Sequence, residues 1–200
     1  MERKINYQKK LDDLLAGLET SDQKPSLLLH ACCGPCSSYV LEYLSKYFQI
    51  TVLYYNPNIY PQEEYERRLS ELKKLYKHFP PALETGVKVV ECEYQPQQFF
   101  DAIGVDENPE LAHEPEKGER CRRCYKFRLE RAAAYAAQNH FDYFCTTLSI
   151  SPFKDAVKIN ELGVEIEGRQ LAGADAAISA NSPKWLFSDL KINGGLKRSL

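Results

Sequence analysis

Short apolar runs alternate with amphipathic segments along most of the chain. The apolar runs have the length of buried strands and lie at Ser26–Ala31, Ile50–Tyr55, Val87–Cys92 and Tyr143–Thr147. The segments between them carry apolar residues at helical spacing, which predicts helices at Tyr7–Leu18, about Cys36–Tyr47, Pro61–His78, Pro96–Ile103, Cys121–Asn139 and from Ser151-Pro152 to about Leu162. Gly104–Arg120 has the composition of a polar loop, and Trp185–Phe187 indicates a further edge strand.

Strands that alternate with helices predict a three-layer α/β fold: a mainly parallel sheet with helices on both faces, of the Rossmann-like or adenine nucleotide alpha hydrolase-like class. Ligands of such sheets bind beyond the carboxyl ends of the strands. Cys32, Cys33, Asn56 and Thr146 all fall at the ends of predicted strands. We therefore expect these residues to meet at one edge of the sheet.

Length and charge indicate the number of domains and the kinds of partner that the protein can bind. The 200 residues suit one domain, in which residues 1–24 form a leading helix and a connector. The formal net charge of −2 implies that a polyanionic partner must meet a local basic patch. No apolar segment is long enough to span a bilayer, and the first residues lead into no hydrophobic signal core, so we expect a cytoplasmic protein without a membrane partner.

Five of the seven cysteines fall into two groups, each where a helical pattern begins. Cys32, Cys33 and Cys36 form the first group, and Cys121 and Cys124 form the second. Backbone N–H groups at a helix start stabilise negative charge and thus favour thiolates. In a reducing compartment, such groups indicate metal binding or redox catalysis more than structural disulfides.

Three kinds of site are compatible with this spacing. Two CxxC pairs separated by a long spacer are typical of a four-thiolate metal site, either an iron–sulfur cluster or a structural zinc. The pair Cys33–Cys36 alone is also the pattern of a thioredoxin-like dithiol oxidoreductase. Cys32 beside that pair and the otherwise unused second CxxC argue against the thioredoxin interpretation, and a fifth thiol is more than a closed zinc site requires.

Four motifs between about Ser26 and Asn160 resemble those of the QueH-type epoxyqueuosine reductases, which perform the last step of queuosine formation in tRNA. They are HACCGPCS (30–37), YYNPNIYPQEEYERR (54–68), EPEKGERCRRCYKFRLERAA (114–133) and TTLSISPFKD (146–155). Members of this family hold a 4Fe–4S cluster with an additional iron beside it. The resemblance implies that the cluster ligands here are Cys32, Cys33, Cys121 and Cys124, and that Cys36 lies close to the second iron.

The implied reaction removes the epoxide oxygen of epoxyqueuosine as water and leaves an alkene. It requires two electrons from a donor that the sequence does not identify, together with two protons. A cubane cluster delivers electrons singly, and an iron with an open position activates an oxygen leaving group as a Lewis acid. Asp155 and His30 are the candidate proton donors by motif, and Cys36 joins Asp155 as a candidate catalytic residue.

A tRNA substrate also requires contacts with the anticodon stem–loop. The resemblance makes Arg122 and Arg123, beside the cluster ligands, candidate contacts, whereas the residues alone favour ordinary solvated or ion-paired helix positions. The further candidate substrate-binding residues are Asn56, Asn58, Thr146 and Lys154. Each has a simpler interpretation as well, because Asn56 and Asn58 suit a turn, Thr146 suits a helix cap and Lys154 suits a solvated surface.

The resemblance weakens toward the C-terminus. Family members usually continue to a Tyr-Cys-Gly-Cys segment, whose two cysteines form a redox-active disulfide. The 200 residues end at Leu200 without that pair, so residues 168–200 are expected to be an atypical or truncated segment. The dithiol oxidoreductase and a zinc-stabilised nucleic-acid-binding module therefore stay open as alternatives at this point.

Overall fold

A five-stranded parallel sheet forms the centre of the protein. The computed structural model describes residues 5–19, 23–172 and 182–199. The strands are β1 (Ser26–Ala31), β2 (Gln49–Tyr54), β3 (Lys88–Glu91), β4 (Tyr143–Thr146) and β5 (Lys184–Trp185). Their order across the sheet is β3-β2-β1-β4-β5, and every pairing is parallel. The predicted Rossmann-like α/β class is therefore confirmed.

The central strand β1 is apolar because it is covered on both faces. Leu27, Leu28 and Leu29 are fully buried, and the register places Leu28 between Thr51 of β2 and Phe144 of β4. A strand buried on both faces has no polar alternation, which explains the continuous run of leucines. The buried apolar cluster around this strand extends from Leu11 to Leu190.

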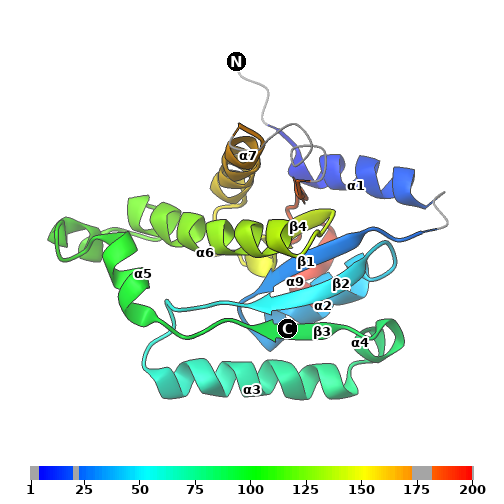
Figure 1. The fold of residues 1–200 in the computed structure, drawn as a ribbon, viewed down its shortest axis with the longest axis horizontal. Helices are drawn as coiled ribbons and strands as arrows, with labels where there is room; N and C mark the ends of the chain where they lie inside the picture. The colour runs from blue at the N-terminus through cyan, green and yellow to red at the C-terminus, as the bar shows by residue number, and fades with distance from the viewer. Residues whose placement is uncertain (1–4, 20–22, 173–181, 200) are drawn as a thin grey trace.

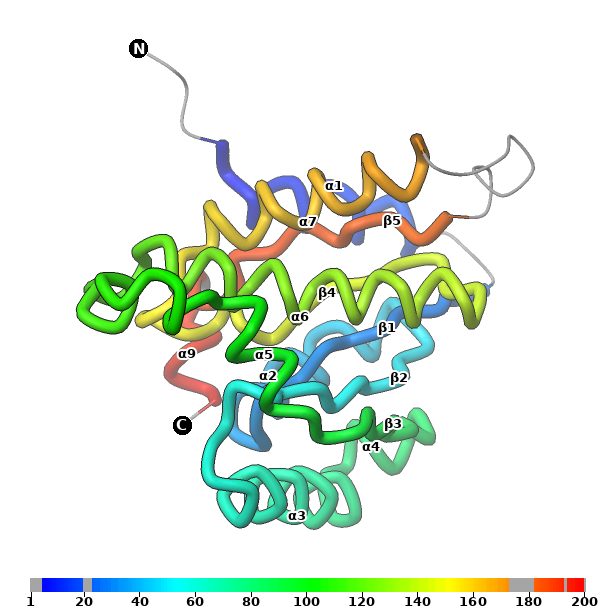
Figure 2. Tube along the Cα trace, turned by 60° about the vertical axis from the view of Figure 1, so that its left-hand side comes forward, coloured from blue at the N-terminus to red at the C-terminus, as the bar shows by residue number. Residues whose placement is uncertain are grey.

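Helices cover the two faces in the way that right-handed crossovers require. On one face, α2 (Gly34–Leu44) connects β1 to β2 and packs on α3 (Gln62–His78), which leads toward β3. On the other, α6 (Glu119–Gln138) precedes β4 and packs on α7 (Ala156–Ala172), which leads toward β5. Figure 1 shows α6 in front of the sheet with α2 behind it, and Figure 2 shows α7 running beside α6.

The remaining elements complete the margins of the sheet. α1 (Tyr7–Leu18) lies beside α2, where Tyr43 donates a hydrogen bond to Asp12. α5 (Pro96–Ile103) packs against α6 (Figures 1 and 2). The short elements are α4 (Pro80–Thr85), the 3-10 turns η1 (Pro109–His113), η2 (Thr147–Ile150) and η3 (Ile192–Gly194), and α9 (Gly195–Arg198).

Several predicted boundaries were wrong. The helix predicted from Ser151-Pro152 begins only at Ala156 and continues ten residues beyond Leu162, through Gly163 and Gly168. α4 and η1 were not predicted, because their prolines resemble turn signals but occupy first helical turns. The expected edge strand is shorter, at Lys184–Trp185.

Part of the segment 168–200, expected to be atypical, lies outside the described residues, at 173–181. The described remainder contains the end of α7, β5, η3 and α9. Among the described residues, no helix has both the length and the apolar character needed to cross a membrane.

Candidate metal centre

Three thiols converge where β1 meets α2. The chain leaves β1 at Ala31, passes through Cys32, and enters α2 with Cys33 as its N-cap residue and Pro35 in the first turn. Cys36 follows in the same turn, so the sulfur atoms of Cys32, Cys33 and Cys36 all lie within 4.8 Å of one another. The strand-to-helix connection predicted from the sequence is thus confirmed, and it forms a group of soft ligands at the sheet edge.

The thiol environment favours one deprotonated sulfur within this group. The neighbouring thiols of Cys33 and Cys36 hold the pKa of Cys32 well below its usual range, with Thr147 and the charge of Arg128 acting in the same direction. Conversely, its contact with Cys32 raises the pKa of Cys33 to about 11. A thiolate is the form in which cysteine binds metals, so Cys32 is the sulfur most prepared to bind one.

Arg128 of α6 connects the second cysteine group to the same edge. Its Nη2 lies 3.3 Å from the sulfur of Cys124, and its Nη1 donates to Oδ1 of Asn56 at 3.4 Å. Asn56 follows β2 closely and in turn donates from Nδ2 to the carbonyl oxygen of Ala31 at 2.9 Å. A continuous path of hydrogen bonds therefore runs from Cys124 to the residue that precedes Cys32.

A second connection links Cys121 to the segment that precedes α7. The Cys121 thiol donates to Oε2 of Glu116 at 3.6 Å, and Lys154 donates to the same oxygen at 3.2 Å. Lys154 lies in the segment after η2, the turn that follows β4, and Thr147 at the start of η2 lies 3.7 Å from the sulfur of Cys32. In the first two turns of α6, Cys124 is thus linked through side chains to the end of β1, and Cys121 is linked to the segment between η2 and α7.

His30, one of the two candidate proton donors, is fully buried and engaged at both ring nitrogens. Its Nε2 lies 3.0 Å from the carbonyl oxygen of Tyr55, so that nitrogen carries the proton, since a carbonyl only accepts. Its Nδ1 then accepts from the Thr146 hydroxyl at 2.8 Å. Burial, followed by the charge of Arg128, lowers the pKa of His30 to about 4. The neutral ring thus joins β1, β2 and β4 instead of facing a ligand.

The fold and this thiol arrangement agree with comparisons to known proteins. The family model for epoxyqueuosine reductase QueH matches residues 27–199. The chain belongs to the epoxyqueuosine reductase QueH family.

Similar proteins cover nearly all of this QueH-family chain. The epoxyqueuosine reductase QueH of Staphylococcus epidermidis is 37% identical over 99% of this chain and 77% of its own length. Those of Streptococcus pyogenes serotype M1 and Staphylococcus aureus are each 35% identical, again over 99% of this chain, and cover 71% and 77% of their own lengths. The family is one of oxidoreductases, and neither the dithiol exchange protein nor the zinc-stabilised module is favoured.

The donor set of this QueH-family chain fits an iron–sulfur group. Among the described residues, the Cys32, Cys33 and Cys36 group is the set of side chains close enough together to hold a metal. Thiolates are the ligands that iron–sulfur clusters take. Cys121 and Cys124 lie outside this close group, and Arg128 and Asn56 link Cys124 to Ala31, the residue before Cys32. The predicted role of Cys121 and Cys124 as ligands is a separate question that stays a prediction.

The predicted substrate-binding residues lie in two different settings. Asn56 and Thr146 are fully buried and hold strand ends together, through Ala31 and His30 respectively. Asn58 has a buried side-chain oxygen, Oδ1, with no hydrogen-bond partner among the described residues. Lys154 is partly exposed and paired with Glu116.

Asp155, the other candidate proton donor, precedes the first residue of α7. Its Oδ1 accepts hydrogen bonds from the backbone N–H groups of Val157 and Lys158, at 3.0 and 3.2 Å. Asp155 is therefore the residue that caps this helix. The sequence pattern favours Ser151 as the cap, but the Ser151 hydroxyl instead accepts from the backbone of Phe153.

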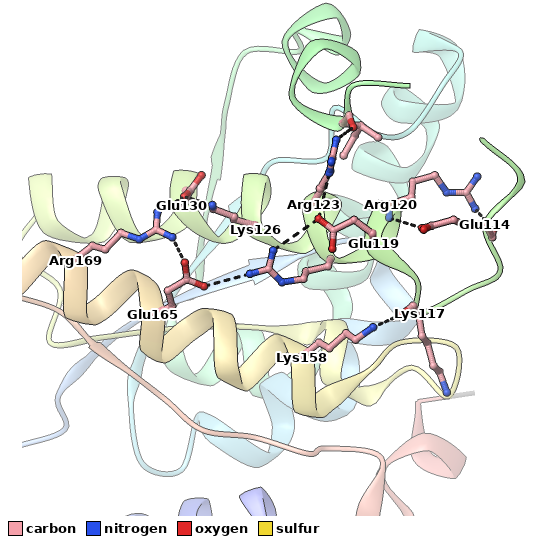
Figure 3. A network of polar contacts seen from close by, with 12 residues as sticks. Glu114, Lys117, Glu119, Arg120, Arg123, Lys126, Glu130, Lys158, Glu165 and Arg169 are labelled. Carbon is pink, nitrogen blue, oxygen red and sulfur yellow. Dashed lines mark hydrogen bonds and ion pairs between the residues drawn. The ribbon is translucent and has the colours of Figure 1, made fainter. Parts of the chain in front are cut away.

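The two predicted tRNA-contact arginines are part of a network of ion pairs between α6 and α7 (Figure 3). Arg122 pairs with Glu119 and Glu165 at 3.8 and 3.5 Å. Arg123 pairs with Glu119 at 3.2 Å and also donates to the carbonyl oxygen of Ile103. Both side chains remain between a third and two fifths exposed, so these pairs are weak enough for another anion to displace them.

Two important side chains were missed by sequence reasoning. Arg128, in the helix predicted at Cys121–Asn139, was not singled out, and Glu116 was placed in a polar loop. A signal for Arg128 exists, because it follows Cys124 by four residues and Cys121 by seven and so shares their helix face. The sequence offers no comparable signal for Glu116, whose position depends on the path of the loop.

Proposed function

We propose that this QueH-family protein reduces epoxyqueuosine to queuosine at the wobble position of tRNA. In the proposal, Cys32, Cys33, Cys121 and Cys124 hold a 4Fe–4S cluster, and Cys36 lies beside an additional iron. The proposal rests on the hydrogen-bond path that runs from Cys124 through Arg128 and Asn56 to the carbonyl oxygen of Ala31. This path connects the second cysteine group to the residue before Cys32, at the carboxyl edge of the sheet. Its support from the family is the match over residues 27–199.

The reaction takes two electrons and two protons, breaks the two C–O bonds of the epoxide and releases one water. When bound, the iron–sulfur group supplies single electrons, and an iron with an open position supplies Lewis acidity. An electron donor outside this chain must reduce the protein, and action on tRNA places the protein in the cytoplasm.

The chain's own residues prepare the site for this chemistry. Arg128 places a fixed positive charge beside the thiols, which stabilises sulfur in its anionic form. His30 is neutral and holds three strands in register, so it does not donate the proton. Asp155 therefore stays the candidate proton donor, and its Oδ1 is already engaged in capping α7.

Substrate contacts follow from the same edge. Lys154 extends from the segment before α7, and its ion pair with Glu116 is partly exposed. A phosphate or ribose oxygen of the substrate can replace Glu116 as the partner of Lys154, and it would then be bound by a cation close to Cys121. Arg122 and Arg123 offer two more cations on the adjoining turn of α6, and Asn56 and Thr146 support the floor of the site from β2 and β4.

The test is conversion of epoxyqueuosine to queuosine in tRNA by the anaerobically reconstituted protein with dithionite as reductant. Nucleosides released from the tRNA are identified by mass spectrometry. Wild type and Cys92→Ala should form queuosine, because Cys92 lies at the end of β3 outside both cysteine groups. Cys33→Ala should form none. Equal conversion by Cys33→Ala, or none by the iron-loaded wild type, contradicts the proposed function.

A further inference from the structure

Five aromatic rings form a continuous series along α5 and α6, which we call the aromatic track. Successive ring centroids are 6.3, 5.8, 6.1 and 5.9 Å apart. The rings in order are Tyr60, Phe100, Phe99, Phe127 and Tyr55. The guanidinium of Arg131 ends the series, 5.9 Å from the centroid of the Tyr55 ring.

One end of the aromatic track reaches the candidate metal centre. Phe127 and Arg131 follow Cys124 by three and seven residues on α6, so the three lie along one side of that helix. Tyr55 accepts a hydrogen bond at its carbonyl oxygen from His30. Phe127, near this end of the track, is therefore about one helical turn from Cys124.

The other end of the track is exposed to solvent. The Tyr60 side chain is 71% exposed and that of Phe100 is 42% exposed, although the two rings contact each other edge to face. The exposed rings of Tyr60 and Phe100 are not needed to pack α5 on α6, because Phe99 and Phe127 already make that contact. Exposed, adjoining aromatic rings are the usual platform for unstacked bases of single-stranded nucleic acid.

A hollow of about 430 Å³ lies beside the track, lined by Tyr55 and Phe127 with Gln95, Gln98 and Arg131 among its polar residues. Amide and guanidinium groups suit the hydrogen-bonding edges of a base. Glu93 also lines this hollow and accepts a hydrogen bond from the side-chain amide of Gln95. Its negative charge disfavours a phosphate, whereas its carboxylate can accept a hydrogen bond from an exocyclic amino group of a base. The chemistry of this hollow is that of a base site rather than a backbone site.

Cations gather at a second hollow that also includes Phe127. This hollow, of about 330 Å³, is lined by Phe127 with Arg122, Arg123 and Lys126, and by the carboxylates Glu119 and Glu130. Lys126 pairs with Glu130 at 4.0 Å, and Glu130 also pairs with Arg169 (Figure 3). Such exposed ion pairs contribute little stability, so a phosphate can replace the carboxylates.

We propose that the aromatic track binds the unstacked bases of a single-stranded RNA loop, with the loop's phosphates along Arg122 and Lys126. The inference rests on the proposed function, since it identifies where the nucleotides next to the reacting base are held. It adds Tyr60 and Phe100 as the outer stacking residues, and the hollow beside Tyr55 and Phe127 as the base site nearest the thiols.

The experiment measures the dissociation constant of an unmodified anticodon stem–loop RNA by fluorescence anisotropy, using the reconstituted full chain. Tyr60→Ala and Phe100→Ala should each weaken binding about 5- to 150-fold, the range for loss of one base–aromatic stack. Tyr60→Phe and Phe100→Tyr keep the ring and should bind as wild type does. Leu83→Ala on α4, a position 60% exposed and distant in the fold from α5, should also bind normally.

Salt dependence separates stacking from charge. The aromatic variants should leave the slope of log affinity against log salt concentration unchanged, because they remove no charge. Lys126→Ala should reduce the magnitude of that slope by about one. Equal affinity of Tyr60→Ala, Phe100→Ala and wild type overturns the inference, as does a wild type that does not bind the RNA.

Failure of the inference is distinguishable from failure of the proposed function. If wild type forms queuosine and the two aromatic variants match its KM, the reaction stands and the track is not the RNA site. If the aromatic variants lose RNA affinity while neither wild type nor the variants form queuosine, the RNA site is supported and the proposed reaction is contradicted. We expect a raised KM with little change in kcat for both aromatic variants.

Discussion

Arg128 places a positive charge in the interior of the protein. Its side chain is 3% exposed, and its hydrogen-bond partners among the described residues are the sulfur and carbonyl oxygen of Cys124 and the amide oxygen of Asn56. Burial of a cation is costly unless an anion accompanies it. None of these partners is a carboxylate; the group near Arg128 that is most readily anionic is the Cys32 thiol, whose pKa the charge of Arg128 lowers.

Replacing Arg128 should therefore change the redox properties of the loaded protein. Arg128→Gln removes the positive charge, and the reduced group loses more stabilisation than the oxidised one because it carries one more negative charge. The reduction potential should fall, as measured by a redox titration followed by electron paramagnetic resonance. Arg131→Gln, one turn farther along α6 and exposed, is the matched control and should retain the wild-type potential. An unchanged potential in Arg128→Gln would refute this role.

Thr146 supports the same site through two hydrogen bonds. Its hydroxyl donates to His30 and accepts from the backbone N–H of Leu148 at 3.2 Å. Thr146→Val leaves both groups buried without a partner, so the free energy of unfolding in urea should decrease by about 1–3 kcal/mol. Thr146→Ser retains the hydroxyl and should lose less. Equal losses in the two variants would show that packing, not hydrogen bonding, gives Thr146 its importance.

Among single residues, the position of Cys32 could be predicted from the sequence, whereas the burial of Arg128 could not. The position of Cys32 follows from local chemistry, because an apolar run, Gly34-Pro35 and a helical pattern fix a strand end beside a helix start. The burial of Arg128 depends on what α6 faces. That face is determined by β1 and by Asn56, which lies 72 residues away in the chain, so no local pattern reveals it.

At the scale of elements, α7 and β5 form the part that the sequence predicted least well. The helix was predicted to end at about Leu162, just before Gly163, whereas α7 continues to Ala172. Gly163 is present because Trp185 of β5 lies directly against it. Asn160, one turn earlier, accepts from the indole N–H of Trp185 at 3.1 Å. The glycine reflects a tertiary contact, which local helix propensity cannot show.

Gly163→Ala tests this contact. An added methyl group would overlap the indole ring of Trp185, so the variant must move β5 or α7. The overlap should outweigh the helix propensity gained, which is about 1 kcal/mol, and the midpoint of thermal unfolding should fall. Gly168→Ala, with open space around its Cα, is the matched control and should raise the midpoint. A stabilised Gly163→Ala would contradict the packing described.

At the scale of the whole molecule, the parallel sheet brings together residues that are distant in sequence. β1, β2 and β4 end at the same edge, which places Cys32, Asn56 and Thr147 together and allows α6 to add Arg128. This convergence was predictable, because the carboxyl ends of parallel strands meet at one edge. The ion pair of Arg122 with Glu165 was not, since it requires the packing of α6 on α7, whereas the pairs of Arg122 and Arg123 with Glu119 lie within α6 at helical spacing.

The central claim is that two distant cysteine groups jointly hold one iron–sulfur group. Its most direct test is iron and acid-labile sulfide content after anaerobic reconstitution of wild type, Cys33→Ala, Cys124→Ala and Cys92→Ala. We predict full content in wild type and Cys92→Ala, and loss of the cluster in both Cys33→Ala and Cys124→Ala. Full iron and sulfide in Cys124→Ala, or zinc without sulfide in wild type, would contradict the claim.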